Sequence, residues 1–160
     1  MAQPVALDWS TEGCTIEGTA EVIGDRWSLL ILREVISGIR RFDQLTVRTR
    51  IPRQVLTGRL ERLLDQGILR REAYQEPGQR QRYEYRLTDK GIDLYPVLVA
   101  MQQWGDRYLA APGGPPTEFE HRGCGERIEL VLRCEGGHEV VNNREVAGRL
   151  GPGAHLRTVG

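Results

Sequence analysis

Arginine is the residue type whose spacing says most about the chemistry of this chain. The 160 residues carry 22 basic and 22 acidic side chains, but the stretch from Arg40 to Lys90 holds thirteen basic and seven acidic residues, a net charge of +6. Local charge, not total charge, sets the potential that a phosphate backbone meets. On charge alone, a nucleic-acid surface and an arginine-rich solvated surface are about equally favoured.

Two groups of side chains in this stretch have chemistry that suits double-stranded DNA. Arg53, Gln54 and Thr57 suit base edges, because an arginine fork matches guanine, a glutamine amide matches adenine and a threonine methyl group contacts thymine. Gly58 beside them would permit close approach of the backbone to the groove. Four further arginines are better placed for phosphates, and these are Arg48, Arg50, Arg80 and Arg82. For any one arginine, a solvated helix face is the alternative.

Cysteine and histidine form a second chemical pattern, near the end of the sequence. His121 and Cys124 are followed, after nine intervening residues, by Cys134 and His138, and both pairs have glycines beside them. Four such ligands on two turns are typical of a small tetrahedral zinc site, so the pattern predicts zinc as a cofactor. A plain β-hairpin without metal is the alternative.

Helices are the elements that must position the first group of residues. Apolar residues at intervals of three and four predict two helices between Thr15 and Ile36 that meet near Gly24. A short helix containing Phe42 and Leu45 comes next. A longer amphipathic helix is expected over 52–66, with Thr49 as its cap and Gly67 as its left-handed end.

A hairpin and a further helix are expected after Gly67. The segments 68–74 and 82–87 have the composition of strands, and Pro77-Gly78 between them is a strong turn signal. Thr88 is able to cap a helix that continues to Ala110, and Pro96 predicts a kink or a new helix start within it. The segment 111–117 has the composition of a linker, and Ile128–Leu132 is strand-like.

The order short helix, tight turn, amphipathic helix, strand, basic turn, strand and helix predicts a winged helix-turn-helix fold of the α+β class, mainly α. The recognition helix, about 52–66, would lie in the major groove, and the wing, about 75–82, would lie on the backbone or in the minor groove. We expect a lead-in over 1–13, a DNA-binding domain over 14–110, a linker over 111–117, and a β-rich, zinc-ribbon-like appendage over 118–160.

The chain resembles the bacterial HxlR-type winged-helix regulators, relatives of the MarR-like group, over residues 14 to about 109. Six blocks agree in order and spacing, and these are Cys14–Glu17, Gly24–Glu34, Arg41–Leu45, Val55–Leu60, Gly67–Arg71 and Tyr83–Gly91.

This resemblance implies a transcriptional regulator that acts as a homodimer, with the flanking first and last helices paired for dimerisation on a near-palindromic operator. It also implies that Cys14 is a candidate sensor, because some members carry a cysteine there that reacts with electrophiles or oxidants. A small-molecule effector is a candidate partner. The alternative for Cys14 is a small buried hydrophobe in the dimer interface.

Other functional classes have little support in the sequence. No apolar run approaches the ~20 residues of a membrane span, and the N-terminus lacks the pattern of a secretion signal, so we expect a cytoplasmic protein. The chain has no nucleophile elbow, phosphate-binding glycine loop or HExxH motif, so we do not expect an enzyme. A winged-helix protein-interaction module without specific DNA binding is the alternative function.

Overall fold

The computed structural model describes residue 10 and residues 12–156, which fall into two compact units. The larger unit covers 19–130, and the described residues before 19 and after 130 make up the smaller one. Most of the predicted lead-in over 1–13 lies outside the described residues. The fold is mainly helical with a two-stranded sheet, as expected for the α+β class.

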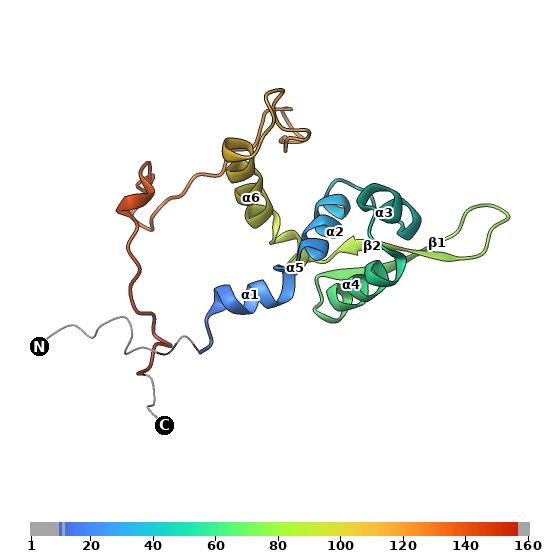
Figure 1. Ribbon diagram of the computed structural model, residues 1–160, viewed down its shortest axis with the longest axis horizontal. Helices are drawn as coiled ribbons and strands as arrows, with labels where there is room; N and C mark the ends of the chain where they lie inside the picture. Colours follow the sequence, from blue (N-terminus) through green and yellow to red (C-terminus); the bar gives the residue numbers. More distant parts are fainter. Residues whose placement is uncertain (1–9, 11, 157–160) are drawn as a thin grey trace, which may run out of the picture. The chain divides into compact units, whose positions relative to one another are not determined.

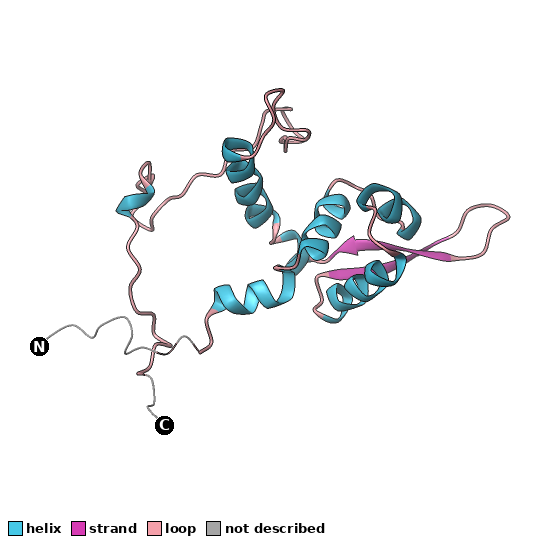
Figure 2. Ribbon diagram, in the orientation of Figure 1, coloured by secondary structure: helices cyan, strands magenta, loops and turns pink. Residues whose placement is uncertain are grey.

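The elements follow the predicted order (Figures 1 and 2). The first four are α1 (Thr15–Ile23), α2 (Arg26–Ile36), α3 (Phe42–Thr49) and α4 (Arg53–Asp65). The hairpin strands β1 (Leu69–Tyr74) and β2 (Arg82–Leu87) come next. They are followed by α5 (Asp89–Ile92), α6 (Tyr95–Tyr108) and the 3₁₀ helix η2 (Asn143–Glu145).

The predicted break between α1 and α2 is confirmed, and it is tight. A Cβ atom at Gly24 would lie 2.4 Å from the backbone oxygen of Ala20 in α1, so a side chain there would force the backbone of the junction to shift. The Asp25 carboxylate then begins α2, since it accepts hydrogen bonds from the backbone N–H groups of Trp27 and Ser28.

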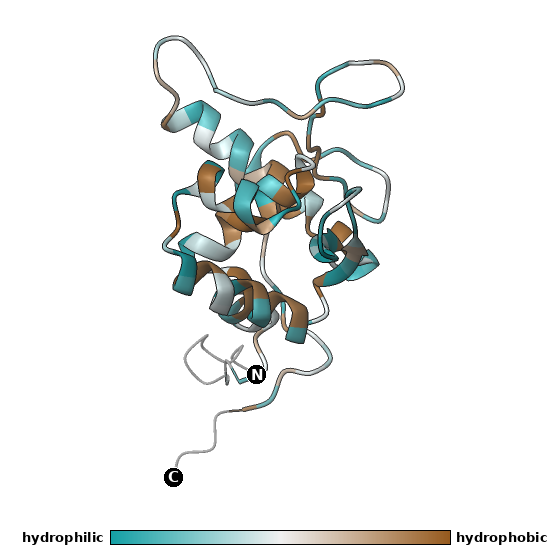
Figure 3. Ribbon diagram, turned by 90° about the vertical axis from the view of Figure 1, so that its right-hand side faces the viewer, coloured by the Kyte–Doolittle hydropathy of each residue, from teal (hydrophilic) through white to brown (hydrophobic). Residues whose placement is uncertain are grey.

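One hydrophobic core holds α2, α3, α4 and the hairpin together. Figure 3 shows hydrophobic and hydrophilic stretches alternating along the helices, as expected where one face is buried. Burial of a large aliphatic side chain contributes about 1.5–3 kcal/mol. The fully buried members of the core include Ile31, Leu32, Leu45, Ile51, Leu56, Leu60, Leu63 and Ile68.

The turn between α3 and α4 differs in one detail from the prediction. Thr49 does not cap α4; its hydroxyl group donates a hydrogen bond back to the Leu45 oxygen within α3. Pro52 occupies the N-cap position without a side-chain bond. Arg50 makes the turn with a φ of 55°, a left-handed conformation that non-glycine residues adopt at some cost. The chain therefore passes from α3 to α4 within three residues.

The hairpin is antiparallel, with Leu69 opposite Leu87 at its base and Tyr74 opposite Arg82 near its turn. Gly67 (φ 65°) ends α4 before it, as predicted. Figure 2 shows that the chain runs on beyond the strands as a loop, which contains Pro77-Gly78. An isolated bridge between Arg41 and Glu84 joins the start of α3 to the hairpin.

The second half of the helical part also follows the prediction. The Thr88 hydroxyl group accepts a hydrogen bond from the Gly91 N–H, which caps α5. Pro96 lies in the first turn of α6, so the proline marks a new helix start. None of the helices among the described residues is long and apolar enough to cross a membrane.

The predicted strand over Ile128–Leu132 is not formed. The Ile128 N–H donates to the Phe119 oxygen, whereas the Leu132 oxygen accepts from the Val140 N–H. The two ends of the stretch therefore pair with different segments, and each pairing amounts to a short turn with an isolated bridge, Glu120 to Arg127 and Arg133 to Glu139. A continuous ladder would need one partner along its whole length.

Candidate nucleic-acid interface

The start of α4 presents polar side chains to solvent. Arg53, Gln54 and Thr57 are exposed, while Leu56 and Leu60 on the opposite face are fully buried. The Arg53 guanidinium group stacks over the Phe42 ring, with 4.9 Å between its carbon and the ring centroid. No salt bridge occupies Arg53 within the described residues, so its N–H groups are available to an outside acceptor.

Gly58 lies on the same exposed face, in the interior of α4. Apart from the neighbouring residues and the backbone of the helix itself, no described atom would lie within 4 Å of a Cβ atom built there, so packing against the rest of the chain does not require a glycine. Glycine in a helix interior is destabilising by about 0.5–1 kcal/mol relative to alanine.

Arg48 and Arg50 differ in their surroundings. Arg48 donates from Nε to the Glu34 carboxylate at 3.0 Å, while Arg50 is exposed and has no side-chain partner among the described residues. Glu34 itself is 1% exposed and also accepts from Arg33. Burial works to raise the pKa of Glu34, but hydrogen bonds and charges from these two arginines outweigh it and lower the pKa.

The arginines in the second half of α4 are turned toward the α1–α2 junction. Arg59 lies 3.2 Å from the Asp25 carboxylate, and Arg62 donates to the backbone oxygen of Glu21 at 2.5 Å. Burial works to raise the pKa of Asp25, but hydrogen bonds from Ser28 and the charge of Arg59 outweigh it and lower the pKa. Neither arginine was separable by sequence from the DNA-facing group.

The wing, defined here as Gln75–Arg82, carries the exposed Arg80 and Arg82. Neither side chain has a salt bridge within the described part of the chain. Arg41, which sequence reasoning did not select, anchors the wing: its guanidinium group contacts the Glu76 carboxylate at 2.6 Å and lies over the Tyr74 ring at 4.3 Å. The contact joins residues 35 positions apart, and no local pattern in the sequence signals it.

The remaining predicted site residues lie outside this surface. Cys14 is exposed just before α1. In the larger unit, His121 Nδ1 lies 3.2 Å from Cys124 Sγ, and in the smaller unit, Cys134 Sγ lies 3.6 Å from His138 Nδ1.

Each pair thus has the types and the proximity that a metal chelate needs, but no three His, Cys, Asp or Glu side chains gather at one point within the described residues. The zinc site stays a prediction. Zinc content near one equivalent per chain, in protein purified without chelator, would support it, and less than about a tenth would contradict it.

Comparison with known proteins identifies the family to which this surface belongs. A family model described as HxlR-like helix-turn-helix matches residues 22–112. The chain belongs to this family. An HxlR-like relative, the uncharacterized HTH-type transcriptional regulator Rv3095 of Mycobacterium tuberculosis, is 42% identical over 142 residues, which make up 89% of each protein.

Solved structures agree with the HxlR-like assignment. The crystal structure of PA1607 superimposes with a TM-score of 0.73 at 32% identity, covering 86% of this chain and 96% of PA1607. The redox regulator HypR in its reduced form gives a TM-score of 0.52 at 32% identity, covering 58% of this chain and 91% of HypR. The HxlR-like relatives are transcriptional regulators and not enzymes. This confirms the prediction that the chain is a transcriptional regulator and the prediction that it is not an enzyme.

Proposed function

We propose that this HxlR-like regulator binds double-stranded DNA sequence-specifically, with α4 in the major groove and the wing on the adjacent backbone or minor groove. Gly58 carries the proposal. Gly58 lies exposed in the interior of α4, where glycine destabilises the helix. The rest of the chain leaves room for a side chain at this position. A glycine here is therefore explained if the DNA comes close to the helix backbone. Arg53, Gln54 and Thr57 on the exposed side of this helix are the proposed base contacts.

The proposed phosphate contacts are the arginines around α4 and on the wing. Arg50, Arg80 and Arg82 are exposed without salt bridges among the described residues, so they can neutralise phosphates without breaking an internal pair. Arg48 uses Nε for Glu34, which leaves its terminal N–H groups for a phosphate and holds the side chain in place.

A mobility-shift titration tests the DNA proposal. The intergenic DNA beside the gene, searched for an inverted repeat, serves as the probe, and affinity should fall steeply with added salt. Gly58→Ala should raise stability by about 0.5–1 kcal/mol while weakening binding to the repeat. A stabilised Gly58→Ala protein that binds as tightly as wild type would contradict close approach at this position. Binding that salt does not weaken would favour the protein-interaction module instead.

We also propose that the regulator is a homodimer. Val97, Met101, Trp104 and Tyr108 recur at intervals of four, three and four along α6, which is the spacing of a helix-pairing seam. Trp104 and Tyr108 are each 59% exposed, and Met101 is 48% exposed. A row of this kind is covered most simply by a second copy of the same helix, since a two-fold axis makes the surface its own complement.

Sedimentation velocity tests the dimer. Trp104→Lys should shift the protein from dimer to monomer, because a charge in the seam would be buried without a partner. Arg144→Lys in the smaller unit serves as the matched surface control. A wild-type monomer at micromolar concentration, or a Trp104→Lys dimer, would contradict the seam.

A thiol response at Cys14 is a second, smaller proposal. Cys14 is exposed, and its backbone oxygen accepts from the Gly18 N–H, so the thiol sits at the first turn of α1. The similarity to HypR, named as a redox regulator, supports a test of the same chemistry here. Diamide should alter operator binding of wild type and leave Cys14→Ser unaffected; equal responses in both proteins would exclude Cys14.

A further inference from the structure

A second arginine-rich region lies away from the wing, at the base of the hairpin. There the surface forms a hollow of about 340 Å³, which is within the range of ligand pockets of about 300–1,000 Å³. Arg40, Arg70, Arg86 and Arg122 line it, and no carboxylate does. Four cations from four separate segments therefore converge on one concave surface.

Two of these arginines are neutralised within the hairpin. Arg70 and Arg86 are direct partners across the strands, a like-charge pairing that is unfavourable by itself. Glu72 compensates for it, because its Oε2 lies 2.9 Å from Arg70 and 3.2 Å from Arg86. Glu84 adds a second contact to Arg86 at 2.6 Å. Glu72 and Glu84 thus balance the charges of Arg70 and Arg86.

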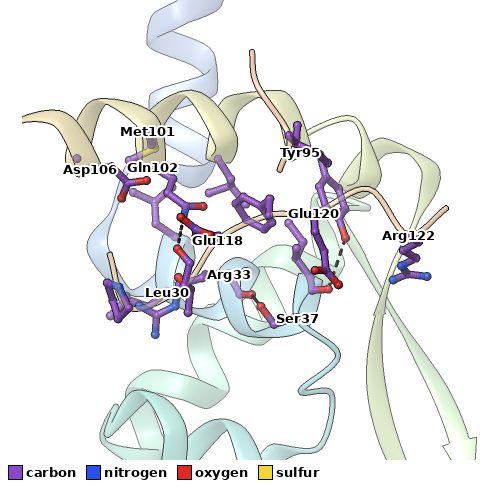
Figure 4. A pocket seen from close by; sticks show the side chains of 18 residues that line it. Leu30, Arg33, Ser37, Tyr95, Met101, Gln102, Asp106, Glu118, Glu120 and Arg122 are labelled. Carbon is purple, nitrogen blue, oxygen red and sulfur yellow. Dashed lines mark hydrogen bonds between the residues drawn. The ribbon is translucent and has the colours of Figure 1, made fainter. Parts of the chain in front are cut away.

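Arg40 and Arg122 have no such compensation. Neither side chain makes a salt bridge or a hydrogen bond to any described residue, although Arg40 is half-buried. Figure 4 shows Arg122 at one end of the neighbouring cavity of about 680 Å³, beyond Tyr95 and Glu120. Glu120 lines that neighbouring cavity and not the hollow. The hollow therefore keeps two positive charges that the fold does not balance.

The remaining wall of the hollow is apolar. Ile36, Leu87 and Ile92 contribute aliphatic surface, and Tyr95 contributes an aromatic ring. The Tyr95 hydroxyl group donates to the Ile36 backbone oxygen at 3.4 Å, which satisfies its polar atom and leaves the ring toward the cavities. A ligand that fills this space meets charge on one side and hydrocarbon on the other.

Operator DNA is a poor fit to this hollow. Arg70 and Arg86 lie one residue from the base of the six-residue strands, and four to five residues, about 13–17 Å along a strand, separate them from the wing. The base of β1 also follows the C-terminal end of α4, whereas the proposed base contacts lie at its N-terminal end. A duplex held by α4 and the wing would face the opposite end of the hairpin.

We propose that this hollow binds a small organic anion that carries two negative charges on a flat apolar group. Arginine suits such a ligand because its planar fork pairs with carboxylate or phosphate oxygens and its face stacks on flat groups. The negative charges of the ligand would pair with Arg40 and Arg122, and they would thus supply the counter-charges that these two arginines lack in the fold. The site does not depend on DNA binding.

Isothermal titration calorimetry of the full chain, without DNA, tests the site with phenyl phosphate as the probe. One molecule should bind per chain, at least about tenfold more tightly than inorganic phosphate or benzyl alcohol. Inorganic phosphate lacks the flat apolar group, and benzyl alcohol lacks the negative charges. Arg122→Gln and Arg40→Gln should each weaken binding by about tenfold or more. Arg71→Gln is the matched control, since Arg71 neighbours Arg70 but points to the other face of the strand.

Three outcomes would overturn the proposal. Wild-type protein that binds phenyl phosphate no better than benzyl alcohol has no anion site of this kind. Equal weakening in Arg71→Gln and Arg122→Gln would show a diffuse charge effect. Displacement of the probe by operator DNA, with matching loss of operator affinity in Arg122→Gln, would make the hollow part of the DNA surface. Thermal melting of each variant confirms that it is folded.

Discussion

The first turn of α4 and its second half carry the same residue type, arginine, in two different settings. Arg53 stacks on Phe42 and leaves its N–H groups to solvent, whereas Arg59 and Arg62 are turned to Asp25 and to the Glu21 backbone oxygen. A count of basic residues therefore overstates the charge available to a partner. The usable charge is what remains after internal pairing.

Arg53→Ala should have the largest effect on DNA. Loss of a bidentate base contact is worth about 1–3 kcal/mol, so operator affinity should fall roughly tenfold or more and the preference at one base pair should relax. Stability should fall by no more than about 0.5–1 kcal/mol, through the lost stacking on Phe42. Fluorescence anisotropy with the operator and with single-base variants measures both affinity and preference.

Arg59→Ala should affect stability and not DNA recognition. It should lower stability by about 0.5–1 kcal/mol through the lost Asp25 contact and leave base preference unchanged. Arg144→Ala, exposed in the smaller unit, controls for the loss of one positive charge. If Arg53→Ala and Arg59→Ala relaxed the same base preference, the two halves of α4 would not differ as described.

Glu34→Gln should produce a smaller, pH-dependent effect. Because the pKa of Glu34 is lowered in the folded state from an ordinary value of 4.5, its stabilisation is present above that value and is lost as the pH falls through the folded pKa. Near neutral pH the substitution should reduce stability by about 1 kcal/mol. Urea unfolding at neutral and at acidic pH measures the difference in the free energy of unfolding between wild type and Glu34→Gln. This difference should become smaller below pH 4.5. A constant difference would contradict the ionised pair.

Arg80→Ala should have the smallest effect. A wing phosphate contact gives register and affinity without base preference, so binding should weaken similarly for all sequences. The slope of log affinity against log salt should become shallower by about 1. An unchanged slope would remove Arg80 from the phosphate contacts and leave the wing without a demonstrated role.

The elements of the fold could be predicted because each is specified locally. The break at Gly24, the left-handed end at Gly67 and the Pro77-Gly78 turn all follow from backbone preferences of single residues. Thr49 could not be assigned correctly, because the sequence does not show that the turn places Pro52 at the N-cap of α4. The Thr49 hydroxyl group instead donates to the Leu45 oxygen and accepts from the Ile51 N–H.

The pairing of charges could not be predicted, because it depends on contacts between distant segments. Arg41 meets Glu76 from 35 positions away, and the hollow combines Arg40 with Arg122. For Ile128–Leu132, a strand-like composition was present, but the hydrogen bonds divide between Phe119 and Val140. Composition indicates what a segment is able to do, and tertiary contacts decide which partner it takes.

The anchoring of the wing has a consequence for how such a regulator would respond to a signal. Arg41 joins the wing to α3, Arg48 joins α3 to Glu34 of α2, and Arg59 joins α4 to the start of α2. These three contacts hold α2, α3, α4 and the wing together as one rigid DNA-binding unit. In the proposed homodimer, a signal would therefore change the distance between the two DNA-binding units and not the shape of either one. The two units would then no longer match the ~34 Å repeat of the DNA helix.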